Sequence, residues 1–110
     1  MILNPTDLIL IQISAGSKEE AEKIANLLLQ EKLAACIQLL PVTSCFNWDN
    51  KQQMENEYLL QVKTSAVLFK KIEAAVTAIH SYEVPEILGL PVIFCNKPYE
   101  NWLKKEVELT

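Results

Sequence analysis

Residues 7–14 have the sequence DLILIQIS, a nearly continuous aliphatic run that ends at the Ala-Gly-Ser turn of residues 15–17. A short apolar run bounded by turn-forming residues predicts a buried β-strand. Ser17 is followed three positions later by Glu20, which is the spacing of a capping box, and apolar residues then recur at helical intervals. The sequence therefore predicts a strand that leads directly into a helix ending near Lys32.

The middle of the chain predicts a long β-hairpin. Residues 34–48 are extended and rich in apolar side chains, with Pro41 as a bulge or edge position, and the return strand covers residues 54–63. Asp49 and Asn50 lie between them, and both residue types tolerate the positive φ of a tight hairpin turn.

The remaining segments complete the fold prediction. Apolar spacing predicts a helix over residues 65–79, a short last strand over residues 90–95 and a final helix beginning near Pro98. The order is β-α-β-β-α-β with a C-terminal helix. That order is typical of an α+β, ferredoxin-like arrangement with an antiparallel sheet, and we expect a single domain over residues 1–110.

Charge and hydropathy exclude several classes of partner. The chain carries ten basic residues, all of them lysine, and fourteen acidic residues, for a formal charge of -4. Nucleic-acid binding relies on clustered positive charge and often on arginine, so we expect no nucleic-acid partner. No apolar run approaches the roughly 18 residues of a membrane span, and residues 1–7 lack the features of a secretory leader. We therefore expect a cytoplasmic protein with no membrane partner.

The three cysteines, Cys36, Cys45 and Cys95, are odd in number and widely spaced. This pattern fits neither a disulfide framework nor a structural zinc site with paired cysteines. The sequence predicts reduced thiols located in strands.

The first predicted strand is apolar on both faces, with isoleucines at 9, 11 and 13 and leucines at 8 and 10. In the predicted fold the helices cover only one face of the sheet, and the other face should alternate with polar residues. An apolar second face indicates an interface, so we expect a homo-oligomer. Trp48, near the tip of the long hairpin, is predicted to contact a neighbouring subunit.

Five pieces of the sequence together resemble a known family. The chain contains EKLAAC at 31–36, PVTS at 41–44, Trp48 beside the turn, EY at 57–58 leading to KT at 63–64, and HSYEVPEIL at 80–88 leading to LPV at 90–92. In this order and at these intervals, the pieces resemble the CutA divalent-cation tolerance proteins, and the likeness covers nearly the whole chain.

The resemblance implies a ferredoxin-like homotrimer in which the sheets of three subunits pack together and the hairpins pair with neighbours, similar to the PII signalling proteins. It also implies tolerance of divalent metals such as copper, proposed metal binding and no established catalytic activity. Some members have a cysteine at the end of the first strand as a proposed copper ligand, and Ile13 occupies that position here.

A metal site is predicted at His80, Glu83 and Glu86, which follow one another at intervals of three. Imidazole and carboxylate ligands suit Cu(II) or Zn(II), and we expect such a metal to be weakly bound. The alternative is that His80 ends a helix, where a cation is favoured, while the two glutamates bond nearby backbone or lysine.

A cleft site is predicted around Lys63, which the family pattern places near Cys36 and Tyr82. A buried lysine in a cleft between subunits is a candidate for binding an anionic effector. The alternative is an ion pair of Lys63 with Glu86 or Glu57 that fixes the subunit junction.

Two functional hypotheses follow from the resemblance together with these residues. The first is a trimeric, metal-responsive CutA-like protein, and the second is a PII-like module that binds a small-molecule effector or a partner protein. An enzyme is not expected, since the chain has one histidine and no catalytic motif. The acidic residues Glu19, Glu20 and Glu22 are interpreted as a solvated face at a helix N-terminus.

Overall fold

The computed structural model describes residues 6–107. Its elements follow in the order β1 (Leu8–Ala15), α1 (Lys18–Gln30), β2 (Cys36–Trp48), β3 (Lys51–Ser65), a 3-10 turn (Ala66–Leu68), α2 (Phe69–Ile79), β4 (Ile87–Pro91) and α3 (Lys97–Glu106). Residues 1–5 and 108–110 of the predicted domain lie outside this range, as do most of the residues from which the absence of a leader was predicted.

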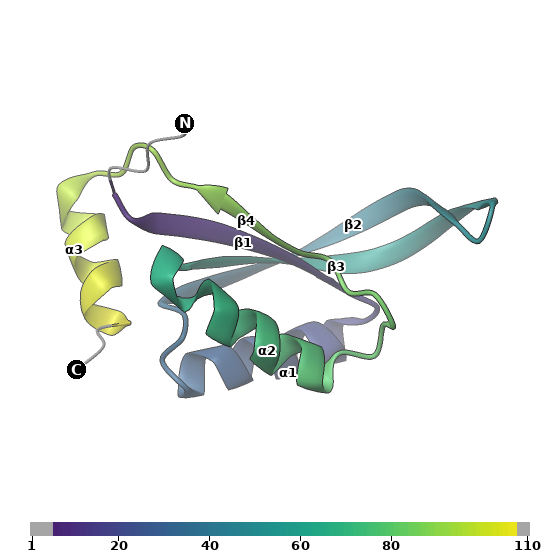
Figure 1. Cartoon of the computed structure of the whole chain (residues 1–110), viewed down its shortest axis with the longest axis horizontal. Helices are drawn as coiled ribbons and strands as arrows, with labels where there is room; N and C mark the ends of the chain where they lie inside the picture. The colour runs from purple at the N-terminus through teal and green to yellow at the C-terminus, as the bar shows by residue number, and fades with distance from the viewer. Residues whose placement is uncertain (1–5, 108–110) are drawn as a thin grey trace.

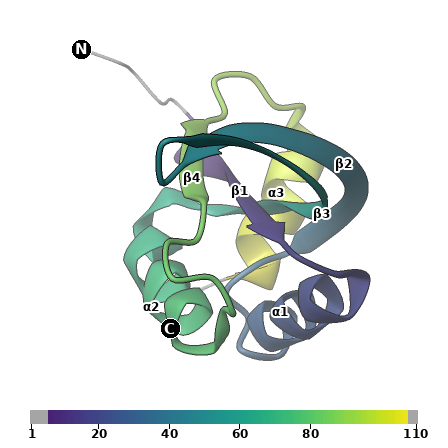
Figure 2. The same ribbon diagram turned by 90° about the vertical axis from the view of Figure 1, so that its right-hand side faces the viewer.

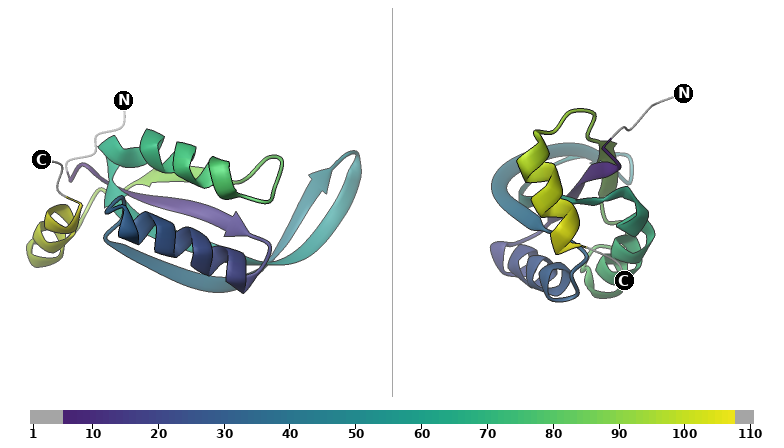
Figure 3. Two further views of the ribbon diagram at one scale, coloured as in Figure 1. Left: turned by 90° about the horizontal axis from the view of Figure 1, so that it is seen from below. Right: turned by 90° about the vertical axis from the view of Figure 1, so that its left-hand side faces the viewer.

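The four strands of the described chain form an antiparallel sheet in the order β2-β3-β1-β4. Helices α1 and α2 lie side by side across one face of this sheet, and α3 lies at one end (Figure 1; Figure 3, left). The predicted α+β, ferredoxin-like fold with a C-terminal helix is therefore confirmed.

The core lies between the sheet and the two covering helices. Ile11 and Ile13 of β1 are fully buried, and so are their cross-strand partners Val62 and Leu60 of β3. Helix α1 buries the predicted apolar positions against them: Ala21, Ile24, Ala25 and Leu28. Side chains at alternate positions of each strand thus fill one face of the sheet, as the period of two requires.

The start of α1 follows the predicted capping box. The Ser17 hydroxyl accepts a hydrogen bond from the Glu20 backbone N–H at 3.1 Å and satisfies one of the free donors of the first turn. The predicted second helix begins later than expected. A 3-10 turn precedes α2, and Ser65 makes no side-chain cap to it.

The long hairpin is confirmed. Asp49 and Asn50 form its two-residue turn with φ values of 54° and 63°. Pairing between β1 and β3 stops at Ala15 and Tyr58, whereas β2 and β3 stay paired to the turn. We call residues 42–57 the hairpin arm, because this two-stranded segment projects beyond the four-stranded part of the sheet (Figures 1 and 2).

The last strand was wrongly placed by the sequence. It was predicted over residues 90–95, but β4 covers Ile87–Pro91. Its ladder with β1 runs from Ile87 to Pro91 and is followed by a hydrogen bond from the Val92 N–H to the Leu8 carbonyl. Beyond Leu8 the chain turns at Asp7, where φ is 59°, so the apolar residues after Val92 have no β1 neighbour to pair with.

The cysteine predictions are partly confirmed. All three thiols are free, and Cys36 and Cys45 lie in β2. Cys95 was expected in a strand, and this was wrong because it follows the end of β4.

Stability depends on the buried side of α1. We expect Leu28→Ala to lower the free energy of unfolding by about 2–5 kcal/mol, because Leu28 is fully buried and its truncation leaves a cavity. Leu29→Ala is the matched control, since Leu29 is 42% exposed and should change stability by less than about 1 kcal/mol. Urea denaturation followed by circular dichroism measures both, and equal effects would contradict this assignment of the core.

Candidate functional site

The sheet face opposite α1 and α2 carries exposed apolar side chains of the described chain. Residues of β1, β2, β3 and β4 alternate with the core positions to form it. Its apolar members, which we call the open sheet face, are Leu10, Leu40, Leu59, Leu88 and Leu90. Leu88 is 54% exposed and Leu40 is 40% exposed, so a single chain leaves this face to solvent.

The hairpin arm extends the open sheet face. Phe46 and Trp48 have the same strand parity as Leu40, so they lie on the corresponding side of the arm. Both are large and exposed, and Trp48 is 49% exposed. Clustered aromatic residues on one side of a projecting element are typical of an interface.

Helix α3 covers one end of the open sheet face and contacts the predicted lysine there. Lys63 is the cross-strand partner of both Leu10 and Cys36. Its Nζ atom lies 5.5 Å from the centroid of the Tyr99 ring, within the range of a cation–π interaction. Among residues 6–107, Lys63 forms no salt bridge, so the expected ion pairs with Glu86 or Glu57 are absent within one chain.

The structure brings together only two of the three predicted cleft residues. Cys36 and Lys63 face each other across the ladder, but Tyr82 contacts Glu57, six residues away from Lys63 along β3. Six residues of strand correspond to about 20 Å. Tyr82 therefore lies at the opposite end of the sheet within a single chain.

His80 is held by hydrogen bonds at both ring nitrogens. Its Nδ1 accepts from the Tyr82 N–H at 3.0 Å, so Nε2 carries the proton and donates to the Ser14 carbonyl at 2.7 Å. The side chain is only 1% exposed. His80 thus connects the loop that follows α2 to the C-terminal end of strand β1.

Glu20 clamps the same loop from the other side. Its carboxylate accepts hydrogen bonds from the Ser81 N–H at 2.7 Å, the Ser81 hydroxyl at 2.9 Å and the Gly16 N–H at 3.3 Å. It also lies 3.7 Å from His80 Nδ1. Burial would raise the pKa of Glu20, but the hydrogen bonds from Ser81 and Gly16 outweigh it and hold that pKa below its ordinary value.

This role of Glu20 was not predicted from the sequence. Together with Glu19 and Glu22 it was interpreted as part of a solvated face, yet it is a partly buried tether between α1 and the loop after α2. The capping box was the available signal, since it indicated a carboxylate turned back toward the start of the helix.

Tyr82 forms the third part of this network. Its hydroxyl donates to Glu57 Oε2 at 2.5 Å, and its ring lies 4.8 Å from the His80 ring. A Cβ atom added at Gly16 would lie 3.2 Å from the Tyr82 hydroxyl, so glycine permits this close approach. Burial, the hydrogen bond to Glu57 and nearby carboxylate charges raise the pKa of Tyr82 well above its ordinary value, and its hydroxyl remains a donor.

The predicted metal ligands do not converge. Glu83 and Glu86 are exposed, whereas both ring nitrogens of His80 are engaged elsewhere. Within residues 6–107, no group of three or more histidine, cysteine, aspartate or glutamate side chains is arranged to hold a metal ion. One chain thus offers the two carboxylates but no complete ligand set.

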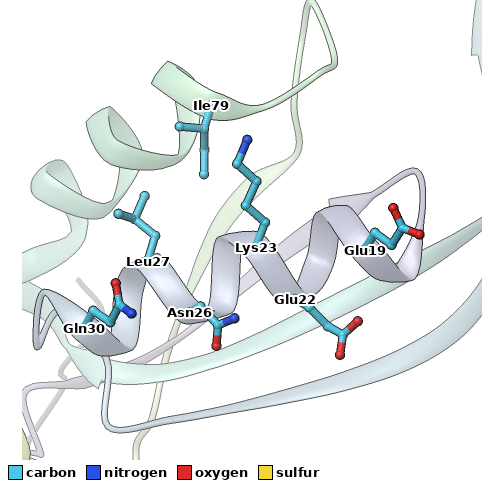
Figure 4. A pocket seen from close by; sticks show the side chains of 7 residues that line it. All are labelled: Glu19, Glu22, Lys23, Asn26, Leu27, Gln30 and Ile79. Atoms are coloured by element: carbon cyan, nitrogen blue, oxygen red, sulfur yellow. The ribbon is translucent and has the colours of Figure 1, made fainter.

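A groove on the described chain lies away from these residues. It is an open groove of ≈ 540 Å³ between α1 and the end of α2, and Lys23, Leu27 and Ile79 point into it (Figure 4). Exposed side chains of one helix form most of its lining, and none belongs to the His80 network. The groove offers no convergent set of polar groups for a ligand.

Residues 9–106 match the family described as CutA1 divalent ion tolerance protein. The chain belongs to this family. It is 40% identical over 96 residues to the divalent-cation tolerance protein CutA of Thermus thermophilus, covering 86% of this chain and 93% of that protein. It is 37% identical over 97 residues to the chloroplastic protein CutA of Arabidopsis thaliana, covering 87% of this chain. The match spans about half, 53%, of that plant protein.

Solved CutA structures share the same fold. The structure of the periplasmic divalent cation tolerance protein CutA from Archaeoglobus fulgidus matches with a TM-score of 0.90 at 39% identity, covering 92% of this chain and 99% of that one. The CutA1 structure from Oryza sativa also gives a TM-score of 0.90, at 34% identity, covering 94% and 95% of the two chains. In this CutA-family chain, no helix among residues 6–107 has the length and apolarity needed to span a bilayer.

The Glu20 clamp predicts a pH-dependent loss of stability. We expect Glu20→Gln to lower the free energy of unfolding by about 1–2 kcal/mol near neutral pH, because hydrogen bonds to a charged acceptor are stronger than those to an amide. The folded-state pKa lies below the unfolded value near 4.5, so the contribution of the carboxylate is present above that pH and is lost as the pH falls through the folded pKa.

Urea denaturation of the wild type and the variant at several pH values between about 3 and 7 measures this effect. Glu22→Gln is the matched control, since Glu22 is an exposed carboxylate on the same helix and should leave stability nearly unchanged. A difference between wild type and Glu20→Gln that persists undiminished at the lowest pH would argue against a stabilising charge at Glu20.

Proposed function

We propose that this CutA-family chain acts as a homotrimer in the cellular response to divalent metal ions such as copper. The observation that carries the proposal is the open sheet face, whose leucines no helix within residues 6–107 covers beyond the end occupied by α3. Exposed apolar surface of this kind favours association, because burial removes it from water. The proposed role in the response to divalent metal ions is based on membership of the divalent ion tolerance family.

The hairpin arm supports assembly in a second way. The arm projects from the body of the domain (Figure 3, left), and its residues Phe46 and Trp48 are exposed in the single chain. In a trimer the arm reaches a neighbouring subunit, and Trp48 packs against it. The open sheet face and the aromatic side of the arm then form one continuous interface.

Metal contact is proposed for the loop that carries Glu83 and Glu86. Both carboxylates are exposed, and a neighbouring subunit supplies the ligands that one chain lacks. His80 has a positioning role, since its two hydrogen bonds set the path of this loop. With Ile13 in place of the cysteine found in some family members, oxygen ligands are expected to predominate and binding to Cu(II) or Zn(II) to be weak.

A second candidate function is a PII-like module that binds a small anionic effector, or a partner protein, in the cleft between subunits. The observation in its favour is Lys63, a partly buried lysine beside Cys36 that has no carboxylate partner among residues 6–107. Tyr82 contributes only from a neighbouring copy, because it lies at the other end of the sheet in its own chain. This function therefore depends on the trimer.

As part of this proposal, the protein is a binding protein rather than an enzyme, and it works in the cytoplasm. Its three free thiols suit a reducing compartment. A role in binding rather than catalysis is consistent with the His80 network, in which the polar groups bond one another and hold a loop in place.

Trimer formation predicts a specific effect of charge on the open sheet face. We expect the wild type to sediment as three copies at micromolar concentration and Leu88→Lys to shift it toward smaller species, because the substitution buries an unpaired charge in the interface. Val67→Lys is the matched control, since Val67 is exposed on the 3-10 turn outside the sheet. A wild-type protein that sediments as a folded single chain would overturn the proposal.

Metal binding at the loop predicts weaker binding when its charge is removed. We expect the double variant Glu83→Gln with Glu86→Gln to bind Cu(II) and Zn(II) at least about tenfold more weakly than the wild type in titration calorimetry. The double variant Glu19→Gln with Glu22→Gln removes the same charge from exposed positions at α1 and should bind like the wild type. Identical isotherms for all three proteins would exclude this loop as the metal site.

A further inference from the structure

The hairpin arm places two sulfur side chains opposite each other. Cys45 of β2 and Met54 of β3 are direct partners in the antiparallel ladder. Directly opposite residues have Cβ atoms about 4.5–5.5 Å apart on one face of a sheet, so the two sulfurs can reach a common point between the strands. Both residues are exposed, and Met54 is 72% exposed.

The same two residues line a hollow on the arm. It has a volume of ≈ 410 Å³, and its other lining residues are Phe46, Asn47, Gln52 and Gln53. Asn47 and Gln52 are cross-strand partners with the same parity as the sulfur pair, so their amides lie next to it. The hollow therefore combines two sulfur donors with adjacent amide oxygens and has room for an ion.

The sulfur pair lies on the side of the arm that the proposed trimer does not use. Side chains alternate along a strand, so Cys45 points away from the side that carries Phe46 and Trp48. The aromatic side continues the open sheet face, whereas the sulfur side carries neighbouring polar pairs such as Thr43 and Asn56, which hydrogen-bond across the strands. The proposed assembly through the aromatic side therefore does not use the side chains of Cys45 and Met54, although Phe46 also borders the hollow.

We propose that Cys45 and Met54 form a binding site for a soft monovalent metal ion, copper(I). Thiolate and thioether are the protein ligands that Cu(I) prefers, and carboxylates are not. On binding, the Cys45 thiol releases its proton to solvent and its sulfur donates an electron pair to the metal, while the thioether sulfur of Met54 donates a second. The copper keeps its oxidation state.

This inference deepens the proposed function and rests on it only for the biological use of the site. It proposes that sulfur ligands in the hairpin arm bind Cu(I). The loop of Glu83 and Glu86 is proposed to bind Cu(II) or Zn(II) instead. The two sites use different residues and different ligand chemistry, so each can fail separately.

The test is an anaerobic titration in which the full chain competes for Cu(I) with bicinchoninate, a chromophoric chelator. We expect the wild type to withdraw one Cu(I) per chain, Cys45→Ser to withdraw none, and Met54→Leu to bind at least about tenfold more weakly. Cys95→Ser is the matched control, because Cys95 is a free thiol outside the strands, and it should bind like the wild type.

X-ray absorption at the copper edge supplies a readout that does not depend on affinity. Two sulfur neighbours of copper in the wild type and one in Met54→Leu would support the site. Equal Cu(I) affinity of wild type and Met54→Leu, or unchanged binding by Cys45→Ser, would overturn it.

Sedimentation and Cu(II) calorimetry on the same variants separate this proposal from the proposed function. Cys45→Ser that loses Cu(I) yet keeps its assembly state and its Cu(II) isotherm supports an independent soft-metal site. A negative Cu(II) result on the wild type counts against the loop site alone, because the Cu(I) titration measures different ligands.

Discussion

An antiparallel sheet has two faces, and in this chain the helices α1 and α2 cover only one of them. The isoleucines of β1 are buried on the covered face, beneath the helices. On the other face, Leu40, Leu88 and Leu90 remain exposed. This imbalance decides how the rest of the molecule is used. It is the physical reason for the proposed association with further copies, and in that proposal a binding site on the open side lies at a junction between chains.

The polar side chains around the loop after α2 have a mainly structural role. Glu20 joins the start of α1 to Ser81, while His80 and Tyr82 tie the same loop to β1 and β3. A buried polar network of this kind rigidifies the structure when all its members are bonded. It fixes the loop that carries the exposed carboxylates Glu83 and Glu86, which are the proposed metal contacts.

The hairpin arm shows how strand alternation gives one element two chemistries. Aromatic residues on one side, including Trp48, continue the apolar face of the sheet, while Cys45 and Met54 oppose each other on the other side. The two-residue turn with positive φ values sets the register of the arm, and the register decides which residues become neighbours. The proposed assembly and the proposed Cu(I) site therefore use side chains on different sides of the same arm.

Local patterns in the sequence determined the first three strands, the approximate positions of the helices, the Ser17 cap and the hairpin turn, because each depends on residues close together in the chain. Residues 8–13 have apolar side chains at both odd and even positions, and this pattern also predicted an apolar second face of the sheet. Only the tertiary structure decided the end of β4, since a strand extends only as far as its partner does. It also decided that His80 and Glu20 act as tethers, because their partners Ser14 and Ser81 are distant in sequence and come close only where β1 and α1 pack against the loop after α2.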